Sequence, residues 1–188
     1  MKLMQTTSVE ELIAGCRSGN RKAQETIYRL YASKMLGVCS RYAKDHQEAE
    51  DMLQVGFVRM FDKICSFKNE GSFEGWLRRI MVNTAIEFYR RSSKMYVVDV
   101  EEAYDQHSDE FPMHAINVND LMKIIQALPP GYRMVFNMYA IEGYSHREIA
   151  ETMGISEGTS KSQLARARNV LKNIINKMEA NQHGTAAR

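Results

Sequence analysis

The sequence predicts an all-α protein made of two small helical bundle domains joined by an acidic linker. Apolar residues recur at spacings of three and four along most of the 188 residues, which is the period of a helix. Capping signals precede several of these stretches, and no stretch alternates long enough between apolar and polar residues to predict a sheet. We expect domains over residues 1–95 and 120–188, with the linker over 96–119.

The first domain is expected to hold four helices around one core. Ser8 with Glu11, and Asp45 with Glu48, form capping pairs that predict where two of the helices begin. The segment SFKNEGS, residues 66–72, has the composition of a loop. The four helices are expected from Ser8 to about Gly19, from about Asn20 to Ala43, from Asp45 to Cys65, and from Phe73 to about Arg91 or Lys94.

The linker differs in composition from both domains. Residues 96–119 hold six acidic side chains and no Lys or Arg, whereas residues 21–95 and 120–188 carry net charges of +5 and +3. Two basic modules suggest a polyanionic partner, and the acidity of the linker should keep it off DNA. His107 and His114 lie near acidic residues in the linker, but their scattered spacing does not support a metal site, and we expect no metal elsewhere.

The second domain is expected to be a four-helix bundle. Asp120 can cap its first helix, over residues 121–128. The Pro-Pro-Gly sequence at 129–131 should force a turn. A second helix should then begin at about Tyr132 and reach Ile141.

A helix-turn-helix completes this domain. Ser145 with Glu148 predicts its first helix, which should stop at Gly154 because glycine tolerates the left-handed conformation. Ser156 can cap the second helix. The tail from Ala180 should be frayed.

The second helix of this motif has an apolar stripe and a polar face. The stripe that should pack inward consists of Leu164, Ala167, Leu171 and Ile174. The residues on or beside the opposite side are Gly158, Lys161, Ser162, Ala165, Arg166, Asn169 and Lys172. Small residues near the helix start allow close approach to a groove, and the donors suit guanine edges and phosphates. A solvated amphipathic helix is the alternative, but the capped helix and glycine turn before it favour DNA binding.

The fourth helix of the first domain, FEGWLRRIMVNTAIEFYRR, also has two distinct faces. Its inner side is expected to consist of Leu77, Ile80, Met81, Thr84 and Phe88. The opposite stripe consists of Arg79, Asn83, Ile86 and Arg90, with Trp76 and Glu87 at its margin. With Phe67 and Phe73 nearby, this stripe offers phosphate contacts and flat faces for unstacked bases. The alternative is that the arginines are solvated and the aromatics belong to the core.

The cysteines and the apolar stretches indicate an intracellular protein. Cys16, Cys39 and Cys65 are odd in number, lack a CxxC pairing and lie in helical patterns, so we expect small buried hydrophobes in a reduced compartment. The start, MKLMQTTSVEE, has no apolar stretch of signal-peptide length. Nowhere do about 18 apolar residues run together, so a soluble protein is expected.

The two basic modules, the acidic linker and the helix-turn-helix together resemble a bacterial RNA polymerase sigma factor of the sigma-70 family, most closely the small extracytoplasmic-function (ECF) group. The resemblance covers roughly residues 20–178. Its motifs are AEDMLQVGFVRMF at 49–61, SFEGWLRRIMVNTAIEFYRR at 72–91, and LPPGYRMVFNMYAIEGYSHREIAETMGISEGTSKSQLARAR at 128–168. It implies a cytoplasmic protein that binds core RNA polymerase, recognises −10 and −35 promoter elements and promotes DNA melting. An anti-sigma factor is a further candidate partner, and no catalytic residue or cofactor is expected.

The resemblance also implies roles for particular residues. Residues 46–65 would dock on the coiled coil of the largest polymerase subunit, with Asp51 and Gln54 at the contact positions. The residues implied at the −10 element are Phe67, Trp76, Arg79, Asn83 and Arg90. The amide of Asn83 would contact the non-template strand, and the loop around Phe67 would hold a flipped base.

At the −35 element, the resemblance implies contacts from the second helix of the helix-turn-helix. The residues are Lys161, Ser162, Ala165, Arg166 and Asn169. Three residues depart from the pattern of the family. Ala165 is smaller than the side chain found in some relatives. Val55 stands where an acidic residue is usual, and Ser160 stands where an apolar residue is usual.

Two other classes of protein are weighed against this interpretation. A transcriptional regulator could bind duplex DNA with its helix-turn-helix and use the N-terminal bundle for sensing, and it would bind DNA without polymerase. An enzyme acting on nucleic acid, such as a recombinase, has no support because no Ser, Tyr or carboxylate cluster lies at catalytic spacing. A gel shift tests the first alternative and a cleavage assay on supercoiled DNA tests the second.

Overall fold

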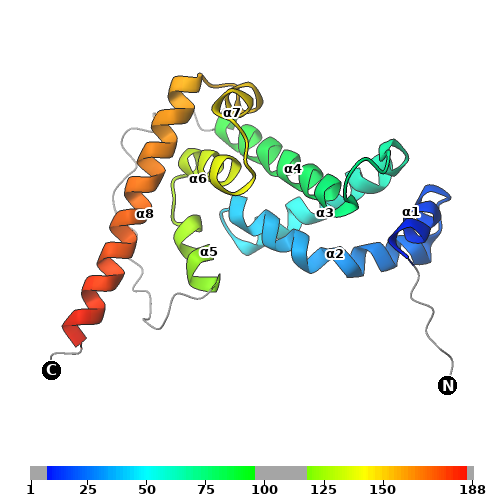
Figure 1. Ribbon diagram of the computed structural model, residues 1–188, viewed down its shortest axis with the longest axis horizontal. Helices are drawn as coiled ribbons and strands as arrows, with labels where there is room; N and C mark the ends of the chain where they lie inside the picture. Colours follow the sequence, from blue (N-terminus) through cyan, green and yellow to red (C-terminus); the bar gives the residue numbers. More distant parts are fainter. Residues whose placement is uncertain (1–7, 96–117, 186–188) are drawn as a thin grey trace. The chain divides into compact units, whose positions relative to one another are not determined.

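The computed structural model of this chain describes residues 8–95 and 118–185. Every regular element in these two ranges is a helix (Figure 1). The predicted all-α class is therefore confirmed. The acidic linker was expected over residues 96–119. Residues 96–117, which include His107 and His114, lie outside the described residues.

The described residues group into two compact units. The first unit contains the described residues up to Cys39 together with His46–Ala85. The second contains Ser40–Asp45 and the described residues from Ile86 onward. This division falls inside the fourth helix, and the expected domain boundary at residue 95 stays a prediction.

The helices expected from the N-terminal half are all present. Their bounds are α1 Val9–Arg17, α2 Arg21–Tyr42, α3 His46–Lys63, the short 3₁₀ helix η1 Ile64–Ser66, and α4 Phe73–Met95. Ser8 caps α1, because its hydroxyl accepts a hydrogen bond from the Glu11 amide over 3.2 Å and its amide donates one to the Glu11 carboxylate over 3.0 Å. The expected loop joins η1 to α4, and in it Asn69 and Gly71 have left-handed φ angles of 59° and 88°.

The core of the first unit is apolar. Its largest fully buried side chains are Ile27, Met35, Met60, Leu77 and Met81. Helices α3 and α4 approach closely at Gly56, where an added Cβ would collide with the side chain of Met81. Burial of each such side chain contributes about 1.5–3 kcal/mol, so this packing fixes α4 against α3.

The second unit holds the remaining helices. Their bounds are α5 Val118–Gln126, α6 Pro130–Phe136, the π-helical turn η2 Asn137–Ile141, α7 His146–Met153, and α8 Glu157–Thr185. Helix α8 contacts α5, α6 and α7. The apolar cluster between them consists of Leu128, Tyr132, Ala167 and Val170, with Phe136, Leu171 and Ile174 packed against it. The stripe of α8 that was expected to face inward does so.

Three helices of the second unit have ends that differ from the sequence-based expectation. Helix α5 ends at Gln126 rather than Leu128. Helix α5 begins at Val118, so Asp120 lies inside its first turn and does not cap it. An acidic side chain is favourable both at the N-cap and in the first turn because of the helix dipole. The sequence therefore does not distinguish these two positions for Asp120. Helix α6 begins at Pro130 rather than Tyr132, because the fixed φ of proline suits the first turn. Helix α8 continues past Ala180, and no proline interrupts its last turns.

The cysteines follow the expectation only in part. Cys16 and Cys39 are buried, and burial raises the pKa of the Cys16 thiol, which keeps it protonated. Cys65 is exposed in η1, so the prediction of its burial was wrong. The helical period on which that prediction depended ends with α3, two residues earlier. None of the helices within 8–95 and 118–185 combines the length and the apolar character that a membrane crossing requires.

Candidate nucleic-acid interface

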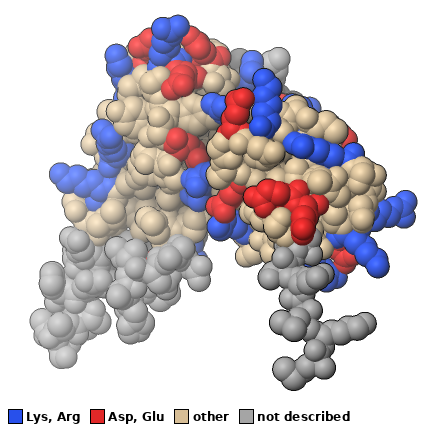
Figure 2. All heavy atoms as spheres, turned by 45° about the vertical axis from the view of Figure 1, so that its right-hand side comes forward, with Lys and Arg blue, Asp and Glu red and all other residues tan. Residues whose placement is uncertain are grey.

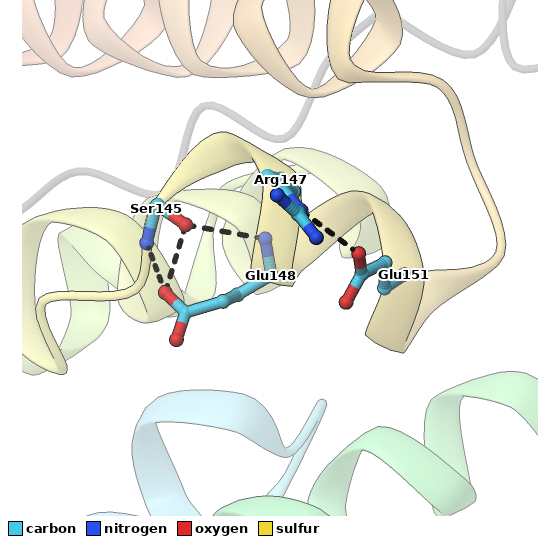
Figure 3. A network of polar contacts seen from close by, with 4 residues as sticks. All are labelled: Ser145, Arg147, Glu148 and Glu151. Atoms are coloured by element: carbon cyan, nitrogen blue, oxygen red, sulfur yellow. Dashed lines mark hydrogen bonds and ion pairs between the residues drawn. The ribbon is translucent and has the colours of Figure 1, made fainter.

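The helix-turn-helix begins with a closed pair of hydrogen bonds at Ser145 (Figure 3). The Ser145 hydroxyl accepts a hydrogen bond from the Glu148 amide over 3.2 Å, and the Ser145 amide donates one to the Glu148 carboxylate over 2.8 Å. In the same helix, Arg147 Nε lies 3.1 Å from a carboxylate oxygen of Glu151, and both side chains are exposed. The Ser145 pair satisfies amides that the first turn of a helix leaves without partners. It fixes the start of α7 where the sequence predicts it.

Gly154 ends α7 and forms the turn of the motif. Its φ of 71° and ψ of 36° are left-handed, a conformation that favours glycine. The amides of Gly154 and Ile155 both donate to the Ala150 carbonyl, over 2.9 and 3.1 Å. The Ser156 hydroxyl then accepts a hydrogen bond from the Thr159 amide over 3.0 Å and caps α8. The turn between the two helices therefore has a glycine C-cap for α7 at one end and a serine N-cap for α8 at the other, as predicted.

The outward face of α8 carries the residues expected at the −35 element. The exposed residues of this set are Lys161, Ser162, Ala165, Arg166 and Asn169. Lys161 Nζ lies 3.9 Å from the Glu157 carboxylate, and Arg166 Nη1 lies 3.4 Å from the Tyr132 hydroxyl. Both contacts are long and therefore weak. The structure brings all five side chains onto one exposed face, and their contact with DNA bases stays a prediction.

Helix α8 also carries a buried polar residue, Ser160, which is 0% exposed. Its Oγ lies 2.9 Å from Nδ1 of His146 at the start of α7. The His146 ring stacks on Tyr139 with 4.5 Å between ring centres and 22° between planes. The guanidinium of Arg168 lies 5.8 Å from the centre of the Tyr139 ring. Ser160 stands out in the sequence because an apolar residue is usual at its position in the family. No role was predicted for His146, because no local signal in the sequence connects residues of different helices.

Helix α4 presents the polar stripe expected at the −10 element. The exposed residues of the stripe are Arg79, Asn83 and Arg90. Trp76 is half-buried at its margin. Ile86 was also expected on this stripe, but it is only 3% exposed, so that expectation was wrong. Val82 and Ala85 are buried as well. The buried face of α4 is therefore broader here than the helical periodicity of the sequence suggested.

Three aromatic side chains form a cluster at the start of α4. The ring centres of Phe67 and Trp76 lie 5.2 Å apart, those of Phe67 and Phe73 5.5 Å apart, and those of Phe73 and Trp76 5.8 Å apart. Phe67 and Phe73 are only 5% and 6% exposed, so their rings contribute to the core. Stacking of an unpaired base on this cluster stays a prediction, and Trp76 is its most accessible member.

Tyr31 of α2 extends the aromatic cluster. Its ring makes an edge contact with Phe73, with 5.4 Å between ring centres. Burial, with a smaller contribution from the Glu74 carboxylate, raises the pKa of Tyr31. Its phenol is therefore neutral at physiological pH, and the contact is one between uncharged rings.

The residues expected to contact core polymerase lie on α3. Asp51 and Gln54 are both exposed, and Gln47 Nε2 lies 3.5 Å from an Asp51 carboxylate oxygen. Gln54 and Glu50 border a hollow of about 270 Å³ between α2 and α3. The remaining residues of the hollow are Tyr28, Ala32, Ser33, Leu36 and Leu53. A hollow lined by both apolar and polar side chains can receive a side chain from a partner, and this contact stays a prediction.

The charged side chains on one face of the molecule are mixed in sign (Figure 2). Figure 2 shows Lys and Arg interspersed with Asp and Glu on the face that it presents, in keeping with a net charge of +2. Among the residues that the structure describes, no group of three or more His, Cys, Asp or Glu side chains is placed to hold a metal ion. The polar groups that α8 and α4 expose are mainly guanidinium, ammonium, amide and hydroxyl donors, which suit phosphates and base edges.

Comparison with known families identifies both parts of the chain. Residues 27–95 match the model for sigma-70 region 2, and residues 119–171 match the model for sigma-70, region 4. The first match covers most of α2 through α4, and the second covers α5 through the first half of α8. These two matches therefore define a sigma-70-type transcription initiation factor.

Curated relatives define the group within this class. The ECF RNA polymerase sigma factor SigW of Bacillus subtilis is 30% identical over 177 residues, which cover 87% of this chain and 95% of the relative. The ECF RNA polymerase sigma factor SigE of Mycolicibacterium smegmatis is 30% identical over 159 residues, which cover 81% of this chain and 62% of that longer relative. This chain belongs to the ECF RNA polymerase sigma factors, and the resemblance inferred from its motifs is confirmed.

A solved structure shares the helical fold. It is the sigma factor RpoE from Bartonella quintana, co-crystallised with the anti-sigma factor NepR. The match covers 81% of this chain and 96% of that chain, with a TM-score of 0.51 and 22% sequence identity. At this level of identity the match shows the fold alone.

Proposed function

We propose that this sigma factor directs core RNA polymerase to promoters by reading two DNA elements with two separate helices. Helix α8 enters the major groove at the −35 element, and α4 with the loop before it binds the −10 element and holds its melted strand. The observation that supports this most is the exposed donor face of α8 behind the closed turn at Gly154. Rigidly placed donors on a helix are what readout in the major groove requires.

At the −35 element, Arg166 is the residue best suited to specify a base. Its guanidinium can donate two parallel hydrogen bonds to one guanine, an arrangement that contributes about 1–3 kcal/mol of discrimination. Lys161 and Asn169 lie on the same exposed face and supply further donors. Ser162 and Ala165 are small and allow the backbone of α8 to approach the groove closely.

At the −10 element, α4 supplies cations and an amide side by side. Arg79 and Arg90 contact phosphates, Asn83 contacts the non-template strand, and Trp76 offers a ring face to an unstacked base. Trapping flipped bases stabilises the open strand relative to the closed duplex. Binding energy therefore drives melting, no residue of this chain is catalytic, and the protein is not an enzyme.

The partners follow from this role. Core polymerase docks on α3, with Asp51 and Gln54 at the contact, and it sets the distance between the two DNA-reading helices. The acidic linker over residues 96–119 mimics the charge of RNA in the nucleic-acid channel of the polymerase. An anti-sigma factor is a further partner, supported by the complex that a protein of the same fold forms. The site of action is the bacterial cytoplasm.

Run-off transcription on genomic fragments tests this function. Core polymerase with the purified chain should start at discrete sites that core polymerase alone does not use. A gel shift with the chain alone and with the holoenzyme separates a sigma factor from a free transcriptional regulator. Tight, specific binding of promoter DNA by the chain alone would contradict the proposal.

A further inference from the structure

The N-terminal helix α1 is attached to the loop that precedes α4. Arg17, the last residue of α1, donates a hydrogen bond from Nε to the Ile64 carbonyl over 3.4 Å and another from Nη2 to the Phe67 carbonyl. These bonds join residues that are 47 and 50 positions apart in the sequence. Ile64 begins η1, and its carbonyl also accepts a hydrogen bond from the Phe67 amide over 3.3 Å. The Phe67 carbonyl lies just beyond the C-terminal end of η1, where a cation is favourable. The bond to Ile64 is long and therefore weak, so the charge-assisted bond to the Phe67 carbonyl is the main attachment.

The loop beyond this contact is held at both of its ends. The Phe67 carbonyl accepts from Arg17, and the Phe67 ring packs against Trp76. At the other end, the Ser72 hydroxyl accepts a hydrogen bond from the Gly75 amide over 3.1 Å at the start of α4. The residues between these ends, 68–72, are all exposed. A short loop between two fixed ends has few conformations, so the position of the Phe67 backbone determines how its exposed residues are presented.

We propose that Arg17 is a positioning residue for −10 recognition, which sets the conformation in which residues 68–72 meet unstacked bases. This inference rests on the proposed role of α4 and its preceding loop at the −10 element. Arg17 directs its donors at the protein backbone and therefore acts through the loop rather than on DNA. The contact comes from outside the residues 27–95 that match sigma-70 region 2, so α1 supplies a support that the matched region does not contain.

Base preference distinguishes positioning from simple stabilisation. A residue that only stabilised the fold would lower the yield of active protein and would slow transcription from every template alike. A residue that positions the loop changes the ranking of −10 sequences. The ranking is therefore the quantity to measure.

The experiment uses holoenzyme assembled from the full chain and core polymerase. The holoenzyme transcribes one template library with randomised −10 positions and a second library with randomised −35 positions. Sequencing of the transcribed templates gives the enrichment of each promoter sequence. Arg17→Ala is expected to reduce the enrichment of the best −10 sequences about tenfold, since the charge-assisted hydrogen bond to the Phe67 carbonyl is lost. Arg17→Lys keeps the charge without the fork of donors and should reduce the enrichment less. The control is Arg29→Ala on α2, whose exposed guanidinium pairs with Glu25 over 2.6 Å, and it should leave the enrichment unchanged.

The −35 ranking must stay at the wild-type order in the Arg17 variants. A wild-type −10 ranking in Arg17→Ala would overturn the inference, and so would a loss of preference in both libraries. If Arg17→Ala does not fold, a wild-type −10 ranking in Arg17→Lys overturns it in the same way. A wild-type holoenzyme without any −10 preference would instead contradict the proposed function on which the inference depends.

Discussion

The buried hydroxyl of Ser160 in α8 lies 2.9 Å from Nδ1 of His146 at the start of α7. A hydroxyl can donate to this ring nitrogen or accept from it, so the bond forms with either tautomer of the ring. It joins the two helices of the helix-turn-helix through side chains. The family resemblance leads one to expect an apolar residue at position 160, so a polar pair takes the place of an apolar contact in this chain.

The Ser160 and His146 side chains should contribute to stability as a pair. Ser160→Ala is expected to lower the free energy of unfolding by about 1 kcal/mol, because it removes one hydrogen bond. His146→Ala is expected to lower it by more, because it also removes the stacking of the ring on Tyr139. The double variant should lose less than the sum of the two, with a coupling of about 0.5–1.5 kcal/mol. Urea unfolding of the full chain measures all four proteins. Strictly additive losses would show that the pair is not coupled.

A glycine at the α3–α4 crossing should be required for packing. Gly56→Ala is expected to lower the free energy of unfolding by about 1–3 kcal/mol, because the added methyl group meets the fully buried Met81 side chain. Gly37→Ala is the matched control, since an added Cβ there meets nothing within 4 Å. That variant should be neutral or more stable by about 0.5–1 kcal/mol, because alanine favours the helix. Equal effects in both variants would contradict the close packing at Gly56.

Replacement of Arg166 should change −35 recognition selectively. Arg166→Ala is expected to weaken holoenzyme binding to promoters with the preferred −35 element by about 1–3 kcal/mol and to flatten the preference at one base pair. Lys172→Ala, which removes an exposed cation further along the same helix, should weaken binding to all sequences alike. Gel shifts over a panel of −35 substitutions measure both effects. An unchanged base preference in Arg166→Ala would remove this residue from the interface.

Replacement of Asn83 should affect melting more than docking. Asn83→Ala is expected to reduce the thymine reactivity of the −10 region in permanganate footprints, while gel shifts with duplex promoter change little. Loss of an amide contact to a single base costs about 1–3 kcal/mol. Ser92→Ala on the same helix, where an exposed hydroxyl bonds to the Tyr89 carbonyl, serves as the control. Normal thymine reactivity in Asn83→Ala would count against the role of this residue.

Local signals in the sequence placed most of the helices. The Ser8–Glu11 and Ser145–Glu148 capping pairs and the glycine at 154 each involve atoms within a few residues of one another. Such features can be predicted because the hydrogen-bonding partners are fixed by sequence spacing alone. The exposed face of α8 could also be predicted, because its apolar stripe is regular.

Contacts between distant segments could not be predicted in the same way. The Arg17 contacts with Ile64 and Phe67 and the His146–Ser160 bond join distant segments, and no period in the sequence indicates them. Ile86 was misplaced because a helical wheel assumes that one side of α4 is buried, whereas the structure buries a wider arc. Cys65 was misplaced because it follows the end of the helical pattern.

The closed turn at Gly154 has a consequence for the thermodynamics of promoter binding. The chain's own atoms satisfy the start of α7 and the start of α8 before any DNA is present. Ordering of the backbone therefore adds little entropy loss on association, and the loss falls mainly on long exposed side chains such as Lys161 and Arg166. The motif thus enters the groove preorganised, and differences in affinity between promoters should arise from side-chain contacts and DNA shape rather than from refolding of the protein.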